Sequence, residues 1–216
     1  MPVSIQSLIR LVLGFCLLAS ASQAHAASDP IRIIALGDSL TAGLGLEAEN
    51  TFPVKLEAAL RARGHLVTVV NAGVSGDTAR DGLARLDWSV GADADAVIVE
   101  LGANDALRGT DPEVTRNALD AILARLADRG LPVLLAGMQA PPNLGDSFAA
   151  AFNPVYGELA EKYGAALYPF FLDGVAGDSR FNQKDGMHPN VEGVDIIVER
   201  ILPSVEAMIA RVDESH

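Results

Sequence analysis

A serine, a histidine and an aspartate stand in sequence contexts that suit nucleophilic catalysis. Ser39 follows an apolar run and a glycine in the segment 31–43, which reads IRIIALGDSLTAG. A serine hydroxyl is inert unless a base takes its proton and a carboxylate orients that base. His188 is the candidate base, because Asp185 lies three residues before it with a glycine between them. Such a chain can turn the carboxylate onto Nδ1 and leave Nε2 for Ser39.

Each of these residues also has a simpler interpretation. Asp38 or Ser39 could only cap a helix, as both residue types often do. The stretch around the candidate base could be a loop with a local side-chain bond, or half of a metal site. No second histidine or carboxylate cluster stands at ligand spacing, which argues against a metal. The other histidines fit catalysis less well, because His65 falls in a predicted exposed turn and His216 is the last residue.

Donors for an oxyanion follow the first three apolar runs of the chain. Glycines occur after each run, where a backbone can approach a ligand closely and expose its N–H groups. Asn104 adds a side-chain amide. We expect the Ser39 N–H, the Gly73 N–H and the Asn104 amide to surround one oxygen, as the oxyanion of a tetrahedral intermediate requires.

Alternating strand and helix patterns predict the elements that position these residues. Buried strands are expected at residues 31–36, 66–70, 94–101, 132–136 and 165–170. Apolar residues at helical spacing follow within 54–60, 83–86, 114–126, 148–159 and 194–205. The aromatic residues of the fourth helix are interpreted as core or as the wall of a pocket, with core favoured. Pro203 is expected to kink or end the last helix early.

This alternation predicts a three-layer α/β/α sandwich. A five-stranded parallel sheet with right-handed crossovers would carry helices on both faces. By analogy with flavodoxin-like folds, we expect the strand order 2-1-3-4-5. Ligands of such sheets bind outside the carboxyl ends of the strands, which is where the serine would lie.

Residues 1–26 are predicted to be a cleaved secretory signal. Arg10 is the only charge among the first 28 residues, and the apolar run 11–19 is too short to anchor the chain in a bilayer. Small residues at Ala24 and Ala26 predict cleavage after Ala26, with Ala24 as the alternative. We therefore expect one domain over residues 27–216, located in the periplasm or secreted.

Composition excludes several classes of function for the mature chain. The single cysteine, Cys16, lies inside the leader, so disulfides and cysteine ligands are not expected. The 16 Lys and Arg against 28 Asp and Glu give a net charge of −12, which becomes −13 when Arg10 is removed. This charge repels phosphate backbones and anionic headgroups. We expect no nucleic-acid partner, no integral membrane segment after cleavage and no cofactor; the oligomeric state is not indicated.

Four short blocks resemble those of the GDSL or SGNH hydrolases. They are residues 37–40 (GDSL), 73–78 (GVSGDT), 102–105 (GAND) and 185–189 (DGMHP), in the order of the family and across nearly the whole mature chain. The longer stretches ELGANDALRG, QAPPNLG and YPFFLDGVAG are similar to the small secreted bacterial branch described as thioesterase I, lysophospholipase or arylesterase.

The resemblance implies the SGNH fold and a serine esterase that acts through an acyl-enzyme on small-molecule esters or thioesters. It implies Ser39 as nucleophile, His188 as base and Asp185 as its partner. It also implies an oxyanion hole of the Ser39 N–H, the Gly73 N–H and the Asn104 side chain. No G-x-S-x-G elbow surrounds the serine, which argues against an ordinary α/β-hydrolase.

The resemblance also places an acyl groove between the loops at residues 75–78 and 138–144. Few bulky aromatic residues occur there, which favours short or medium acyl chains. Two other kinds of function stay open. One is a non-catalytic protein that binds an anion at the glycine-rich edge. The other is a deacetylase of polysaccharide, although few exposed aromatics are available to stack on sugars.

Overall fold

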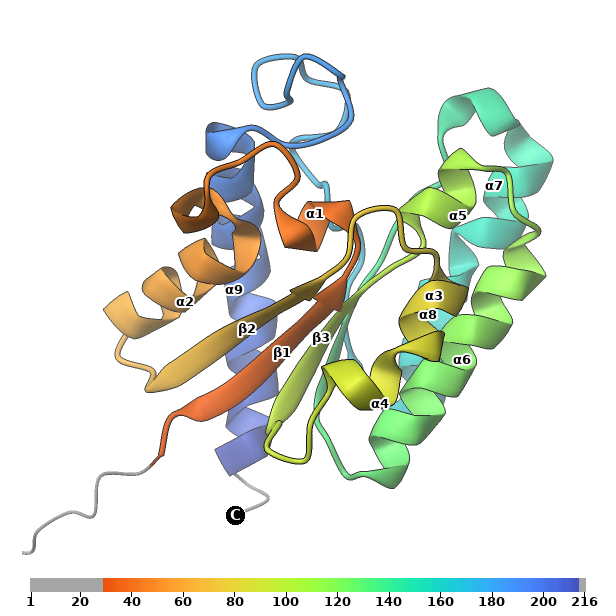
Figure 1. Ribbon diagram of the computed structural model, residues 1–216. Coiled ribbons are helices and arrows are strands. Elements are labelled where there is room, and N and C mark those ends of the chain that lie inside the picture. Colours follow the sequence, from red (N-terminus) through yellow and green to blue (C-terminus); the bar gives the residue numbers. More distant parts are fainter. Residues whose placement is uncertain (1–28, 214–216) are drawn as a thin grey trace, which may run out of the picture.

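The computed structural model describes residues 29–213, which form a parallel sheet between two helical layers (Figure 1). The predicted leader, its cleavage after Ala26, Cys16 and His216 lie outside the described residues.

Five parallel strands form the sheet in the order β2-β1-β3-β4-β5, which confirms the predicted topology. The strands are β1 (Ile31–Gly37), β2 (Val67–Gly73), β3 (Ala96–Glu100), β4 (Val133–Ala136) and β5 (Ala166–Tyr168). Gly37 of β1 is in register with both Gly73 of β2 and Glu100 of β3. The carboxyl ends of these three strands are therefore level, and the segments that leave them lie side by side.

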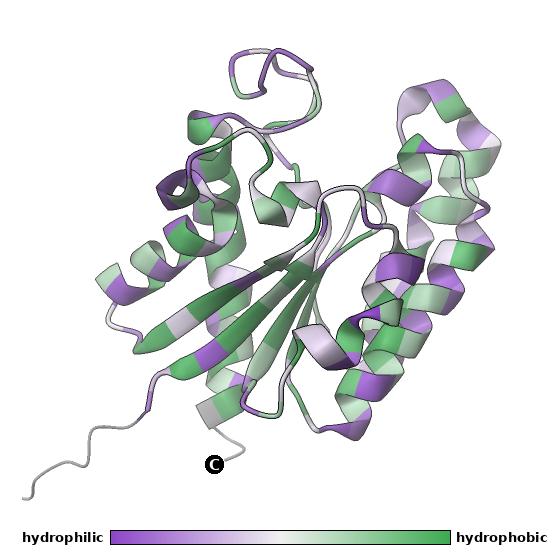
Figure 2. Cartoon of the chain, in the orientation of Figure 1, coloured by the Kyte–Doolittle hydropathy of each residue, from purple (hydrophilic) through white to green (hydrophobic). Residues whose placement is uncertain are grey.

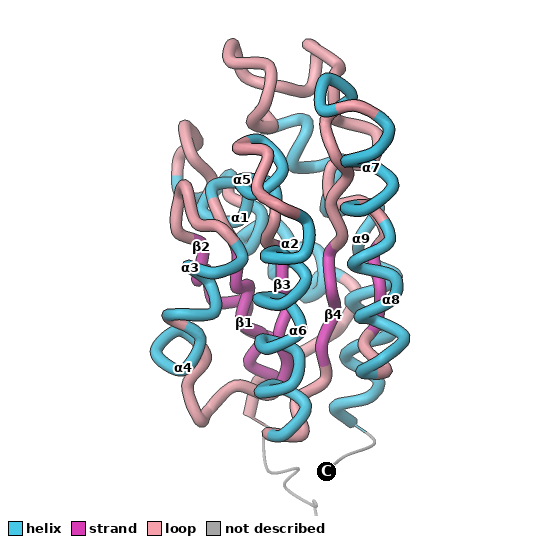
Figure 3. Tube along the Cα trace, turned by 90° about the vertical axis from the view of Figure 1, so that its right-hand side faces the viewer, coloured by secondary structure: helices cyan, strands magenta, loops and turns pink. Residues whose placement is uncertain are grey.

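Helices cover both faces of the sheet (Figures 1 and 3). One face carries α2 (Phe52–Ala62) and α9 (Val191–Asp213); the other carries α3 (Ala79–Ala84), α4 (Leu86–Ser89), α6 (Pro112–Asp128) and α8 (Pro154–Tyr163). The shorter elements lie toward the carboxyl ends of the strands and are α1 (Ser39–Ala42), α5 (Ala103–Leu107), α7 (Asp146–Phe152) and the 3₁₀ turns η1 (Ala48–Asn50) and η2 (Pro142–Leu144).

The core lies on both sides of the sheet. Every residue of β3 and of β4 is buried, as expected of central parallel strands that carry helices on both faces. Figure 2 shows these strands in the green of hydrophobic residues. The predicted core aromatics of the fourth helical segment are confirmed, because Phe152 and Tyr156 are buried and Phe148 stacks on Phe152.

Several predicted boundaries are wrong. The segment expected as one helix around Leu83 and Leu86 is split into α3 and α4. The segment 148–159 is split into α7 and α8, because Pro154 starts a new helix, where its missing N–H is not needed. Pro203 was expected to kink or end the last helix early; it does not end it, because α9 continues to Asp213 with this exposed proline inside it.

Other boundaries shift without changing the fold. β2 continues to Gly73, three residues beyond its predicted end, and β5 is shorter than predicted. Within residues 29–213, no helix combines the length and the apolar character needed to cross a membrane.

Candidate active site

The structure brings the three predicted catalytic side chains together. Ser39 is the first residue of α1, directly beyond the end of β1, whereas Asp185 and His188 lie in the loop before α9. The Ser39 Oγ lies 2.9 Å from the His188 Nε2. The His188 Nδ1 lies 2.6 Å from the Asp185 Oδ2. This is the geometry of a serine nucleophile, its base and the carboxylate that orients the base.

Local backbone bonds hold Asp185 in its charged form. Its Oδ1 accepts the N–H of Met187 at 2.9 Å and the N–H of His188 at 3.0 Å. These two N–H groups, together with the ring of His188, lower the pKa of Asp185 to about 2. The local hydrogen bonds that would make this segment an ordinary loop are therefore present. They also orient the Asp185 carboxylate toward the His188 Nδ1. A charged Asp185 favours the tautomer that leaves Nε2 free to accept the Ser39 proton.

Asp38, rather than Ser39, caps α1. The Asp38 Oδ1 accepts the N–H of Leu40 at 3.0 Å, so the Ser39 side chain is not needed for capping. No acceptor among residues 29–213 takes the Ser39 N–H. A backbone donor is therefore available next to the nucleophilic oxygen, as an oxyanion site needs.

The Asn104 amide also lies at the site, and two acceptors hold it. Its Nδ2 donates to the Asp38 Oδ2 at 3.1 Å and to the main-chain oxygen of Asp77 at 3.0 Å. Asn104 is the second residue of α5, which begins after Gly102 at the end of β3. The structure thus places this predicted donor beside Asp38 and the segment that follows β2.

The structure does not place Gly73 as predicted. Gly73 is the last residue of β2, and its N–H donates to the Asn71 Oδ1 at 3.0 Å. A side chain at Gly73 would collide with the backbone of Ala42 and Asp38, so this glycine permits β2 to approach α1 closely. Gly73 is also not among the residues that line the cavity beside Ser39.

Gly76, and not the predicted Gly73, lies at the cavity beside Ser39. It lines the cavity together with Ser39, Asn104 and His188, and its φ of 90° is one that glycine adopts most readily. Its N–H has no hydrogen-bond acceptor within the described part of the chain. Gly73 and Gly76 both follow the second apolar run, so the sequence pattern alone could not choose between them. The structure distinguishes them because β2 extends to Gly73, which leaves only Gly76 in the loop.

The cavity beside Ser39 has a volume of about 580 Å³, within the range of about 300–1,000 Å³ typical of small-molecule sites. Residues 138–142 after β4 line it as expected of the acyl groove, but only Gly76 does so from the predicted segment 75–78, and residues of α5 line it as well. Its apolar lining is Leu40, Leu44, Ala103, Ala106, Leu107, Met138, Ala140, Pro141, Pro142, Phe170, Leu172, Ala176 and Met187. The wall formed by lining residues between Phe170 and Met187 was not predicted from the sequence.

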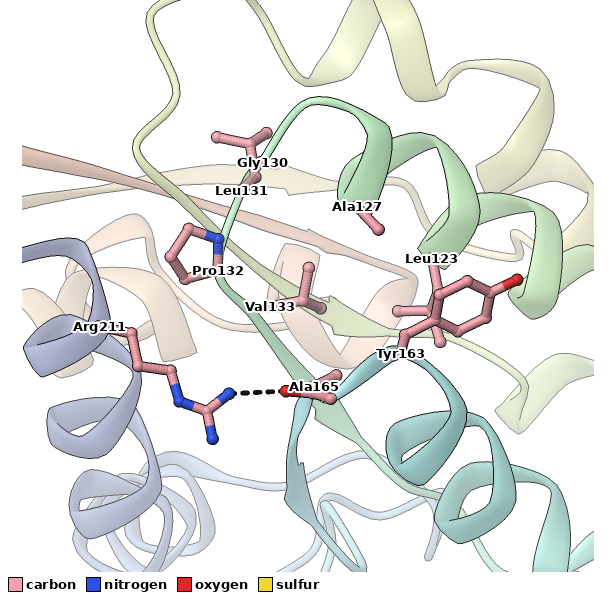
Figure 4. Close-up of a pocket in the computed structure, with 10 residues that line it drawn as sticks. Leu123, Ala127, Gly130, Leu131, Pro132, Val133, Tyr163, Ala165 and Arg211 are labelled. Atoms are coloured by element: carbon pink, nitrogen blue, oxygen red, sulfur yellow. Dashed lines mark hydrogen bonds between the residues drawn. The ribbon is translucent and has the colours of Figure 1, made fainter. Parts of the chain in front are cut away.

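A second hollow, of about 300 Å³, lies at the opposite ends of the strands, near the start of β4 (Figure 4). Arg211 borders it and donates to the main-chain oxygen of Gly164 at 2.7 Å. Its lining contains no serine, histidine or acid, so it offers neither nucleophile nor base. Among residues 29–213, no group of three His, Cys, Asp or Glu side chains could hold a metal ion.

Two buried carboxyl groups lie beneath the nucleophile. The Glu100 Oε2 accepts the Thr41 hydroxyl at 2.8 Å and the Asp38 N–H at 3.4 Å. Burial, with the nearby charge of Asp38, raises the pKa of Glu100 well above its ordinary value. Burial also raises the pKa of Asp38 to about 6, against the opposing effects of the Leu40 N–H and Asn104. Glu100 was not predicted as part of the site, because its only signal in the sequence is a single acid in an apolar strand.

Comparisons with known proteins agree with this geometry. The model of the GDSL-like lipase/acylhydrolase family matches residues 35–196. An arylesterase of Vibrio mimicus is 40% identical over 193 residues, which cover 89% of this chain and 94% of the relative. Thioesterase 1/protease 1/lysophospholipase L1 of Escherichia coli strain K12 is 33% identical over 208 residues, which cover 96% and 98%.

A solved structure extends the likeness to three dimensions. The SGNH-hydrolase family esterase AlinE4 superimposes with a TM-score of 0.70 at 44% identity, covering 83% of this chain and 96% of that one. The family match includes Ser39 and His188, and the relatives align over nearly their full length. The chain belongs to the GDSL-like lipase/acylhydrolase family.

Proposed function

We propose that this serine esterase hydrolyses carboxylic esters of short- to medium-chain acyl groups with aryl or small alkyl alcohols, and also acts on thioesters and lysophospholipids. The hydrogen-bonded chain from Ser39 through His188 to Asp185, at the wall of an apolar cavity, carries this proposal. The esterase, thioesterase and lysophospholipase names of the relatives support the range of substrates.

In the acylation step, the Ser39 Oγ attacks the carbonyl carbon of the ester while the His188 Nε2 takes its proton. Asp185 stabilises the imidazolium that forms. The carbonyl electron pair moves onto oxygen and re-forms the double bond as the alcohol or thiol leaves with the proton from Nε2. Water then attacks the acyl-serine, gives its proton to Nε2, and the acid is released with the Ser39 hydroxyl restored.

Three donors would stabilise the oxyanion in both steps: the Ser39 N–H, the Gly76 N–H and the Asn104 amide. The two backbone donors have no acceptor within residues 29–213. The Asn104 amide donates to Asp38 and Asp77, so its contact with an oxyanion requires that one of these bonds be shared or released.

The test compares residues 27–216 with the same chain carrying Ser39→Ala. Hydrolysis of p-nitrophenyl acetate, butyrate, octanoate and palmitate would be followed beside acyl-CoA thioesters, with thermal melting as the folding control. We expect Ser39→Ala to lose about 10⁴-fold or more in kcat. Equal activity of the two chains would remove Ser39 from the reaction.

The chain-length profile tests the acyl preference separately. We expect kcat/KM to peak at or below octanoate. A peak beyond about twelve carbons would contradict the proposed preference, because the approximately 580 Å³ cavity must hold the chain. Activity on acetylated polysaccharide with none on aryl esters would instead favour the deacetylase alternative.

We propose further that the chain is exported and that residues 1–26 are removed. The basic residue, short apolar run and small residues of this segment support the proposal. Mass spectrometry of the protein from a periplasmic fraction is expected to give an N-terminus at residue 27, or at residue 25 for the alternative site. A full-length chain confined to the cytoplasm would contradict export.

A further inference from the structure

We propose that Arg85 is a positioning residue that holds the oxyanion donors in their relative places, an inference that rests on the proposed function. Arg85 lies at the junction of α3 and α4, and its side chain is only 16% exposed. It contacts neither Ser39 nor His188 through any hydrogen bond described above. Its influence on the reaction must therefore pass through the backbone.

The guanidinium of Arg85 uses four N–H donations within the fold. Its Nη2 donates to the main-chain oxygen of Gly37 at 2.8 Å, and its Nη1 donates to the main-chain oxygen of Ala72 at 2.9 Å. Nη1 also donates to the Ser89 hydroxyl at 2.8 Å, and Nε to the Asp77 Oδ2 at 2.6 Å. Because a guanidinium is planar and rigid, these acceptors are fixed relative to one another.

Two of these bonds fix the strand ends from which the donors extend. Gly37 ends β1, two residues before Ser39, whose N–H is the first proposed donor. Ala72 precedes the last residue of β2, from which the loop bearing Gly76 departs. Arg85 thus joins the two strand ends across which the oxyanion would be held.

The ion pair with Asp77 fixes the other two donors. Asp77 directly follows Gly76, and its side chain is only 13% exposed. The main-chain oxygen of the same Asp77 accepts the Asn104 amide at 3.0 Å. Holding Asp77 therefore sets the places of both the Gly76 N–H and the Asn104 amide. One guanidinium serves as the common reference for all three donors.

Few other described bonds anchor this loop to the sheet. The Val74 N–H donates to the main-chain oxygen of Gly37 at 3.0 Å, at the start of the loop. Beyond it, the exposed side chain of Arg108 donates to the main-chain oxygen of Gly76 at 2.9 Å, from the solvent side. Without Arg85 the loop would keep its turn and the bond from the Asn104 amide to Asp77, but it would lose the link that the guanidinium makes to the ends of β1 and β2.

The expected effect is on the chemical step. Loss of one oxyanion donor lowers kcat by about 10²–10³-fold, and a misplacement of about 1 Å can lower a rate about 10²-fold. We expect Arg85→Met to lower kcat about 10²-fold. KM is expected to stay within about threefold, because Arg85 does not line the cavity. The pH profile of kcat/KM should keep its shape, because the Ser39, His188 and Asp185 contacts stay intact.

The experiment uses residues 27–216 with p-nitrophenyl butyrate and three variants. Arg129→Met is the matched control, because Arg129 also donates to two main-chain oxygens, of Val90 at 2.9 Å and Gly91 at 2.6 Å, away from the site. Arg85→Lys keeps a positive charge near Asp77 but lacks the planar guanidinium, which donates to several acceptors at once. We expect it to lie between the wild type and Arg85→Met, whereas Arg129→Met should keep the wild-type kcat.

The outcomes separate this inference from the proposed function. An inactive wild type overturns both. An active wild type with a folded Arg85→Met whose kcat is within threefold overturns this inference alone, as does a rise in KM without loss of kcat. An equal loss of kcat in Arg129→Met shows a general effect of destabilisation and also overturns it. If Arg85→Met does not fold, Arg85→Lys decides by the same criteria.

Discussion

At the scale of single residues, the buried carboxyl groups of Asp38 and Glu100 beneath Ser39 make the stability of the fold depend on pH. The pKa of Asp38 is raised to about 6 in the folded chain by burial, from 3.8. The folded state therefore binds this proton more tightly than the unfolded state. The resulting stabilisation is fully present below the unfolded pKa and is lost as the pH rises through about 6. The lowered pKa of Asp185, about 2, acts in the opposite sense and only in acid.

We therefore expect Asp38→Asn to reduce the fall in the free energy of unfolding between about pH 4 and pH 6.5. Asparagine cannot titrate, and it keeps an oxygen that can accept the Leu40 N–H. Urea unfolding of the wild type and the variant at several pH values measures this difference. Identical slopes would show that Asp38 does not titrate in this range; Glu100, which is still present, accounts for any remaining slope.

Asn104 should affect rate far more than folding. We expect Asn104→Ala to keep the fold and to lose about 10²–10³-fold in kcat, the usual effect of removing one oxyanion donor. Steady-state kinetics with p-nitrophenyl butyrate, with melting temperature as a control, measures this loss. A folded variant with full activity would remove Asn104 from the mechanism.

Residues that pair locally could be predicted from the sequence, whereas those placed by tertiary register could not. Asp185 and His188 lie three residues apart, so their bond follows from local chain geometry, and His188 in turn reaches Ser39 as expected. The choice between Gly73 and Gly76 depends on where β2 ends, and β-branched patterning does not define that residue. Glu100 could not be identified as part of the site because neighbouring strands, not neighbouring residues, surround it.

At the scale of elements, Gly102 sets the start of α5. Its φ is 112°, and a side chain there would collide with the Tyr156 hydroxyl, which donates to the main-chain oxygen of Leu101 at 2.9 Å. Gly102→Ala must therefore adopt a strained backbone and displace a buried hydrogen bond. Asn104, two residues later, would move with the backbone.

We expect Gly102→Ala to lower the free energy of unfolding by more than Gly130→Ala does. Gly130 has a φ of 68°, and a Cβ added there would meet no other atom, so its variant suffers only the backbone strain of about 1–2 kcal/mol. The loss of the Tyr156 bond should add about 1–3 kcal/mol at Gly102. Urea unfolding of both variants measures the difference, and equal losses would contradict the proposed collision.

Proline shows why helix boundaries were predicted less well than helix existence. Pro154 begins α8, where a missing N–H is harmless, and the chain divides there into two helices. Pro203 lies inside α9 on the exposed side, while Ile201, Leu202 and Val205 around it are buried. Packing of this inner face holds the helix together despite the lost bond. Propensity alone cannot weigh that packing.

At the scale of the whole molecule, the acidic composition should distinguish charged from neutral substrates. The chain carries a net charge of −12, or −13 without Arg10. Acyl-CoA is anionic, so repulsion should raise its KM at low ionic strength, where the Debye length is about 30 Å at 0.01 M. A neutral p-nitrophenyl ester does not experience this repulsion.

We expect kcat/KM for acyl-CoA to rise when the ionic strength increases from about 0.01 to about 0.15 M. The value for p-nitrophenyl butyrate should change little under the same conditions. Parallel kinetics on both substrates provide the comparison, with the neutral ester as the control for general salt effects. A salt-independent acyl-CoA reaction would show that the local field at the cavity is not set by the net charge.

The overall topology was the most predictable level. Five alternations of strand and helix leave few arrangements for a parallel sheet with right-handed crossovers. The order of the strands required the analogy, because hydrophobic patterns do not state which strands are neighbours. The wall of the cavity formed by residues after 170 could be predicted neither from hydrophobic patterns nor from the analogy, because it comes from an irregular segment with no periodic pattern.

The two halves of the reactive pair lie far apart along the chain. The Ser39 and His188 positions are separated by 149 residues, and the loop that bears the base lies next to the last helix. The chain can therefore form its sheet before Ser39 meets its predicted base, because His188 follows all five strands along the chain. Esterase activity should be acquired only when the loop between β5 and α9, which carries His188, docks. Recovery of turnover during refolding would thus report the final assembly step, after most of the secondary structure has formed.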